Sequence, residues 1–139
     1  MFKFFKKSQF EKINEIKAEF ERLKDKTSAI SINFIGIEGQ INGLTVIEAT
    51  DSESFQSKYF AGLLADTFHK IQNLSEDFIK SEIKMGIINF NSSALIYQPI
   101  TSDILFSCLV PNEKDIKKIE DWLNKNIIKL REIFTSDRV

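Results

Sequence analysis

Residue types that carry most enzyme chemistry are scarce in this 139-residue chain. It contains one histidine, His69, and one cysteine, Cys108, and no motif supplies either with a catalytic partner. A single cysteine cannot form an intramolecular disulfide or a cysteine-rich zinc site, and an apolar strand disfavours its thiolate. We therefore expect Cys108 to fill the core and His69 to lie at a surface or an interface.

Motifs for nucleotides and metals are also missing from the sequence. The five glycines are scattered between positions 36 and 86 and form no phosphate-binding loop. The acidic pairs Glu76-Asp77 and Glu120-Asp121 suit a solvated surface. With 19 basic against 20 acidic residues, the net charge of −1 argues against a nucleic-acid partner. We expect no cofactor, no metal and no enzyme activity.

The first seven residues, Met1–Lys7, combine phenylalanine with lysine. Such a segment could make a weak contact with an anionic membrane surface. No apolar run approaches the roughly 20 residues of a membrane span, and no secretory signal follows the basic start. We therefore expect a cytoplasmic protein.

Two stretches show simple helical periodicity. Residues 8–26 and 112–134 carry apolar side chains every three or four positions, with charged residues between them. Asn112 suits the cap of the second stretch. The expected core positions are Phe10, Ile13, Ile16, Phe20 and Leu23 in the first, and Ile116, Ile119, Leu123, Ile127, Leu130 and Phe134 in the second.

A third helix is expected over about residues 54–74. One face, which is predicted to pack on the core, carries Phe60, Leu64, Thr67, Ile71 and Leu74. The small residues Ala61, Gly62 and Ala65 form a second surface. A glycine inside a helix costs about 1 kcal/mol relative to alanine, and close approach of another backbone is one reason to accept that cost.

Five segments alternate in the manner of β-strands. Asn42-Gly43 predicts a type I′ hairpin turn between the first two strands. The last strand is almost wholly apolar, which predicts a central place in the sheet. The expected strands cover residues 30–37, 44–50, 83–87, 94–100 and 104–110.

The elements follow in the order helix, strand, strand, helix, strand, strand, strand, helix. This order predicts an α+β fold with a five-stranded antiparallel sheet and helices on both faces. We expect a single domain over residues 1–139, with its core at about residues 10–134.

This order of motifs resembles the Roadblock family of dynein light-chain-like domains, which is related to longin and profilin-like folds. The residues that carry the resemblance are the turn Asn42-Gly43-Leu44, the small-residue helix over 59–65, the strand pair over 86–97, and the final strand and helix over 103–134. The resemblance covers nearly the whole chain.

The resemblance implies a homodimer or a heterodimer with another Roadblock protein, in which the third strand and the middle helix of each copy meet. Such a dimer serves as a platform for a small Ras-like GTPase. An exposed edge strand also favours pairing on physical grounds. The expected contact residues are Lys58, Ala61, Gly62, Ala65, His69, Ile83, Met85 and Ile87.

Two alternatives remain open at this point. One is a longin- or profilin-like adaptor in cytoskeletal, motility or membrane-traffic assemblies that has no GTPase partner. The other is a small-ligand sensor, which would need a cavity with convergent polar groups.

Overall fold

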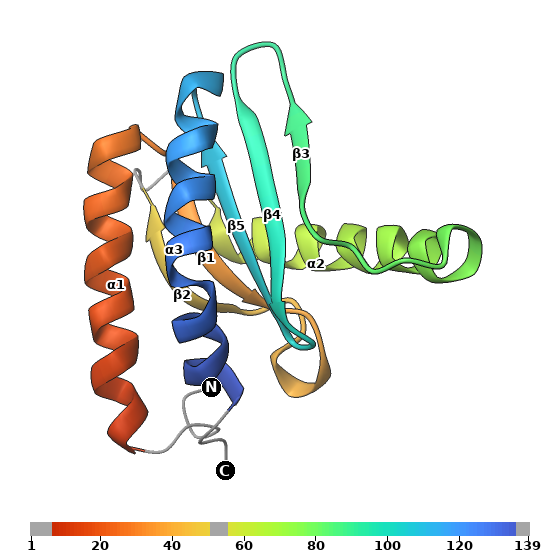
Figure 1. Cartoon of the computed structure of the whole chain (residues 1–139), viewed down its shortest axis with the longest axis horizontal. Coiled ribbons are helices and arrows are strands. Elements are labelled where there is room, and N and C mark those ends of the chain that lie inside the picture. Colours follow the sequence, from red (N-terminus) through yellow and green to blue (C-terminus); the bar gives the residue numbers. More distant parts are fainter. Residues whose placement is uncertain (1–6, 51–55, 136–139) are drawn as a thin grey trace.

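The computed structural model describes residues 7–50 and 56–135. Within these ranges it forms a five-stranded antiparallel sheet, in the order β2-β1-β5-β4-β3, and three α-helices (Figure 1). The predicted order of elements and the α+β class are confirmed. The strands are β1 (Ser31–Gly36), β2 (Thr45–Thr50), β3 (Gly86–Asn89), β4 (Ala94–Thr101) and β5 (Ile104–Val110), and the helices are α1 (Lys7–Thr27), α2 (Ser57–Leu74) and α3 (Ile116–Thr135).

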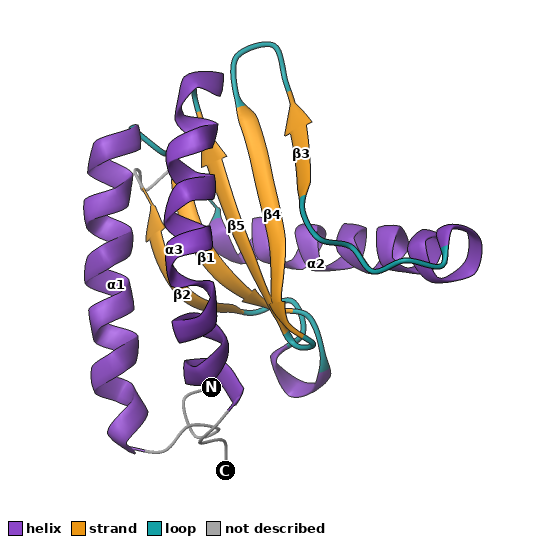
Figure 2. Cartoon of the chain, viewed as in Figure 1, coloured by secondary structure: helices purple, strands orange, loops and turns teal. Residues whose placement is uncertain are grey.

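The helices cover the two faces of the sheet unequally. α1 and α3 lie side by side on one face, while α2 crosses the other face and projects past β3 (Figures 1 and 2). The strands β1, β5 and β4 run through the middle of the sheet, and β5 is central, as its apolar sequence predicted. All six residues of β1 are buried because both of its faces are covered.

An aromatic cluster joins α1 and α3 to the sheet. The ring of Phe34 on β1 lies 4.9 Å from Phe20 of α1 and 5.0 Å from Phe134 of α3, measured between ring centroids. Phe106 of β5 and Trp122 of α3 complete the cluster, at 6.1 Å from each other. These tilted and edge-on arrangements are the ones that aromatic pairs favour.

A second, smaller core lies between the sheet and α2. Ile35 follows Phe34 on β1 and faces this core, because successive side chains of a strand point to opposite faces. From α2 the contributing side chains are Ala61, Leu64, Ala65 and Phe68, and from the sheet and its loops they include Ile37, Leu95, Tyr97 and Leu105.

The connection between β1 and β2 differs from its prediction. The two strands pair antiparallel as expected, but Asn42 has φ −57° and ψ 124°, and Gly43 has φ +79°. With the Leu44 amide donating to the Ile41 carbonyl at 2.9 Å, this is a type II turn and not the predicted type I′ turn. A short 3₁₀ turn, Gly39–Ile41, lengthens the connection, so the two-residue geometry does not arise.

The third strand is shorter than predicted. Ile83 and Met85 precede it, and pairing with β4 begins at Gly86, which stands opposite Tyr97. After α2 the chain makes a π-helical turn, Ser75–Ile79, and then runs back along the helix before it enters β3 (Figure 1). In this return segment, residues 80–85, Ile83 packs partly on the core beneath α2 and Met85 partly on the core beneath α1 and α3. Two residues that would share one face of a strand thus meet different cores.

Candidate interaction surfaces

The two residues with catalytic potential, Cys108 and His69, both contact parts of the fold and no catalytic partner among the described residues. Cys108 is buried on β5, and this burial, with a smaller contribution from the negative charge of Asp115, raises the pKa of its thiol. His69 of α2 is half-buried and its Nε2 lies 2.9 Å from Asn42 Oδ1, which links the helix to the β1–β2 connection. In residues 7–50 and 56–135 no group of three His, Cys, Asp or Glu side chains is placed to hold a metal.

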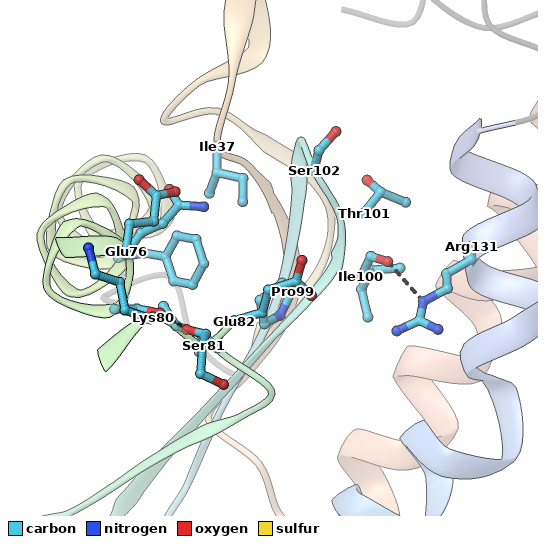
Figure 3. A pocket seen from close by; sticks show the side chains of 14 residues that line it. Ile37, Glu76, Lys80, Ser81, Glu82, Pro99, Ile100, Thr101, Ser102 and Arg131 are labelled. Atoms are coloured by element: carbon cyan, nitrogen blue, oxygen red, sulfur yellow. Dashed lines mark hydrogen bonds between the residues drawn. The ribbon is translucent and has the colours of Figure 1, made fainter. Parts of the chain in front are cut away.

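A cavity of about 690 Å³ opens between the C-terminal half of α2, the return segment and the β4–β5 turn (Figure 3). Ile37 forms part of its apolar lining. Two of the polar groups around it bond within the chain: the Ser75 hydroxyl donates to the Ser81 carbonyl, and Arg131 Nε donates to the Ile100 carbonyl at 3.1 Å. The other polar side chains of the lining come from separate elements and include Glu76, Lys80 and Thr101. Because these groups do not converge on a common centre, the cavity gives little support to a ligand sensor.

The small residues of α2 do not form an outward surface. Ala61 and Ala65 are 0% and 1% exposed and pack against the sheet. The core face of α2 carries Ala61, Leu64, Ala65 and Phe68. Of the predicted stripe, Leu64 is buried, Phe60 and Ile71 are partly buried against this core, and Leu74 is exposed instead. The prediction that Ala61 and Ala65 are available to a second copy is wrong, because the chain's own core occupies them.

Large apolar side chains instead lie on the outer face of α2. Tyr59 is 66% exposed, Leu63 is 51% exposed and Leu74 is 51% exposed. Their spacing of 4 and 11 residues keeps them close to one line along the helix, opposite the core face. A helix with apolar residues on both faces has one face without a partner in the isolated chain.

The β3 edge of the sheet is also apolar and uncovered. β3 is the last strand on that side and, among the described strands, pairs only with β4. Ile87 and Ile88 are 41% and 38% exposed, although neighbouring strand residues point to opposite faces, and Phe90 just after the strand is 52% exposed. We call the exposed apolar residues of both elements the α2–β3 surface: Tyr59, Leu63, Leu74, Ile87, Ile88 and Phe90.

The other predicted contact residues fall in different places. Lys58 and Gly62 are exposed on the flank of α2 that faces the β1–β2 connection, where His69 also lies. Ile83 packs partly against the α2 core, and Met85 packs partly against the α1–α3 core. Of the predicted set, only Ile87 belongs to the α2–β3 surface.

Sequence reasoning missed Tyr59 and Leu63, which are the main apolar residues on the outer face of α2. A signal was present, because Tyr59 and Leu63 are four residues apart and lie on the face opposite Ala61 and Ala65. Two apolar faces on one helix indicate two partners. Periodicity alone does not say which of the two faces meets the chain's own sheet.

Gly62 has no packing reason inside the chain, so Gly62→Ala is expected to stabilise the protein. A Cβ atom built on Gly62 meets no atom within 4 Å, and alanine favours the helix by about 0.5–1 kcal/mol. Urea unfolding at low protein concentration measures this gain. The matched control, Gly43→Ala, should lower stability by about 1 kcal/mol because Gly43 has φ +79°. A loss of stability in Gly62→Ala would contradict the expectation.

Neither a protein-family model nor a curated protein matches the sequence. Among solved structures the chain is similar to Myxococcus xanthus MglB, with 17% identity and a TM-score of 0.76 over 88% of this chain and 96% of that one. It is also similar to the gliding protein MglB of Thermus thermophilus, with 13% identity and a TM-score of 0.69 over 85% of this chain and 90% of that one.

A Roadblock/LC7 domain from Streptomyces avermitilis is similar too, with 10% identity and a TM-score of 0.60 over 81% of this chain and 97% of that domain. At these identities the likeness concerns the fold. The chain therefore has a Roadblock-like fold, as the order of its sequence motifs indicated.

In the described part of the chain, no helix combines the length and the apolar character needed to cross a membrane.

Proposed function

We propose that this chain is a non-enzymatic, cytoplasmic scaffold of the Roadblock type that pairs with a second copy and presents the pair to a small Ras-like GTPase. The observation that carries the pairing is the α2–β3 surface. Large apolar side chains exposed on two elements of a small protein mark interaction sites. An unpaired edge strand beside it offers backbone groups for a continuous sheet across two copies.

The proposed contact keeps the two elements named by the sequence resemblance and changes their residues. Tyr59 and Leu63 replace Ala61 and Ala65 on α2, because the former are exposed and the latter are buried. On β3, Ile87 and Ile88 supply the apolar contact beside the open edge.

The GTPase part of the proposal rests on the Roadblock resemblance and on the fold. One similar structure is described as a gliding protein, MglB of Thermus thermophilus, and another as MglC of Myxococcus xanthus. A paired scaffold presents a continuous surface, and a GTPase offers a surface that changes with its nucleotide.

The test is a pull-down with the tagged chain and Ras-like GTPases of the same genome, each loaded with GTP or GDP. We expect at least one GTPase to be retained in only one nucleotide state. If none shows nucleotide dependence, the GTPase role fails and the longin- or profilin-like adaptor becomes the better interpretation. Sedimentation of the chain alone tests the pairing separately.

A further inference from the structure

The sheet has a second edge, β2, and its outer side forms the floor of a groove. Six consecutive residues, Gly43–Glu48, line a cavity of about 650 Å³. One wall comes from α1, through Ile13, Asn14 and Lys17, and the other comes from the start of α2, through Ser57 and Lys58. The groove thus follows the strand between two helices, at the side of the sheet opposite β3 (Figure 1).

Within the described residues, β2 pairs with β1 on one side only. The other side of an edge strand presents backbone N–H and C=O groups without ladder partners, and an extended segment laid against it becomes an additional strand. Four of the six lining residues, 45–48, belong to β2 and correspond to about 13 Å of strand, which is long enough to pair with about four residues of a peptide.

Two polar atoms in this lining lack partners. Glu48 Oε2 and Thr45 Oγ1 are buried and make no hydrogen bond in the described structure. A buried carboxylate oxygen without a donor is unfavourable, so such groups are normally paired. Lys17 and Lys58 line the same cavity, yet neither forms an ion pair with Glu48 within the described residues. Within the described residues, Glu48 Oε2 therefore lacks a cation or an N–H donor.

We propose that this groove binds an extended segment of a partner protein, which adds to β2 and places an arginine or lysine side chain against Glu48. Arginine suits the site best, because its planar guanidinium presents several N–H donors that match a carboxylate. A second copy of this chain fits poorly. Its β2 sequence, Thr-Val-Ile-Glu-Ala-Thr, would bring another carboxylate and no cation to the groove.

The test selects random ten-residue peptides displayed on phage against the full chain, and then titrates a synthetic selected peptide into the isotope-labelled protein. We expect the selected peptides to carry an arginine or lysine and to shift the amide signals of β2. Glu48→Gln, which keeps the shape and removes the charge, should weaken binding at least about ten-fold. The matched control, Glu38→Gln, changes an exposed residue and should bind as the unaltered protein does.

Thermal unfolding separates binding from folding. Glu48→Gln should melt at or above the temperature of the unaltered chain, since it removes a buried unpaired oxygen charge. If it melts lower, Thr45→Val serves as the second variant, with several-fold weaker peptide binding expected. The proposal is overturned if no peptide is enriched, if enriched peptides lack a basic residue or shift β3 instead, or if both groove variants bind normally. A change in sedimentation caused by Glu48→Gln would also overturn it, because the groove would then belong to a second copy.

Discussion

Leu63→Arg is expected to leave the chain folded and to abolish its pairing, raising the dissociation constant of the pair at least about 100-fold. Leu63 is 51% exposed in the isolated chain, so an arginine there can extend into water without entering the core. When two copies meet through α2, the substitution replaces apolar contact by two guanidinium groups brought together. Like charges placed together at an interface cost several kcal/mol, and each 1.4 kcal/mol changes the constant ten-fold. Sedimentation velocity over a concentration series measures the change.

Two comparison variants make this result interpretable. Ile128→Arg replaces an aliphatic side chain that is 71% exposed on α3, away from the α2–β3 surface, and should pair normally. Ala65→Arg places a charge at a position that is 1% exposed, so it should unfold the chain and reports on folding instead of pairing. The proposed contact is wrong if Leu63→Arg sediments as the unaltered protein does, or if the unaltered protein is already a monomer at high concentration.

α1 and α3 were predictable from sequence because each has one apolar face and one partner. The α1 positions Ile13, Ile16 and Phe20 are buried at the spacing that the sequence shows. On α3, Leu123 and Leu130 behave in the same way. When one face is apolar and the rest is charged, periodicity alone determines which side meets the sheet.

α2 was harder to predict because apolar residues surround much of it. Its inner face uses the small residues Ala61 and Ala65, whereas its outer face carries the larger Tyr59 and Leu63. Side-chain size alone does not separate the two faces, because the inner face also carries the large Leu64 and Phe68. Only the contact with the sheet, where short side chains let the helix lie close, shows which face is internal.

The turn between β1 and β2 and the start of β3 show that short sequence motifs do not fix local structure by themselves. A glycine after asparagine satisfies a type II turn as well as a type I′ turn, because both place a positive φ at the second position. The 3₁₀ turn before Asn42 decides between them, and it depends on the surrounding structure. Likewise, Ile83 and Met85 are apolar because each packs partly on a core, but on two different cores, whereas residues two apart in a strand would share one face.

Phe34→Ala is expected to lower the free energy of unfolding by about 3–5 kcal/mol. Phe34 is 0% exposed, and its ring centroid lies 4.9 Å from that of Phe20, 5.9 Å from Phe106 and 5.0 Å from Phe134. Truncation removes the apolar burial of the ring, leaves a cavity and takes away the shared contact between α1, α3 and the sheet. The loss is a large part of the roughly 5–15 kcal/mol that stabilises a domain. Urea unfolding followed by circular dichroism gives the value.

Phe78→Ala is the matched control, because it deletes the same side chain where it is 78% exposed. At low protein concentration this variant should unfold within about 0.5 kcal/mol of the unaltered chain. The difference between the two losses in unfolding free energy measures the effect of burial, because both variants delete the same kind of side chain. Equal losses in the two variants would contradict the central place of Phe34. A loss confined to Phe34→Ala would show that the packing of α1 and α3 on the sheet carries much of the stability. The exposed apolar face of α2 is then not needed for folding and is free to serve an interaction.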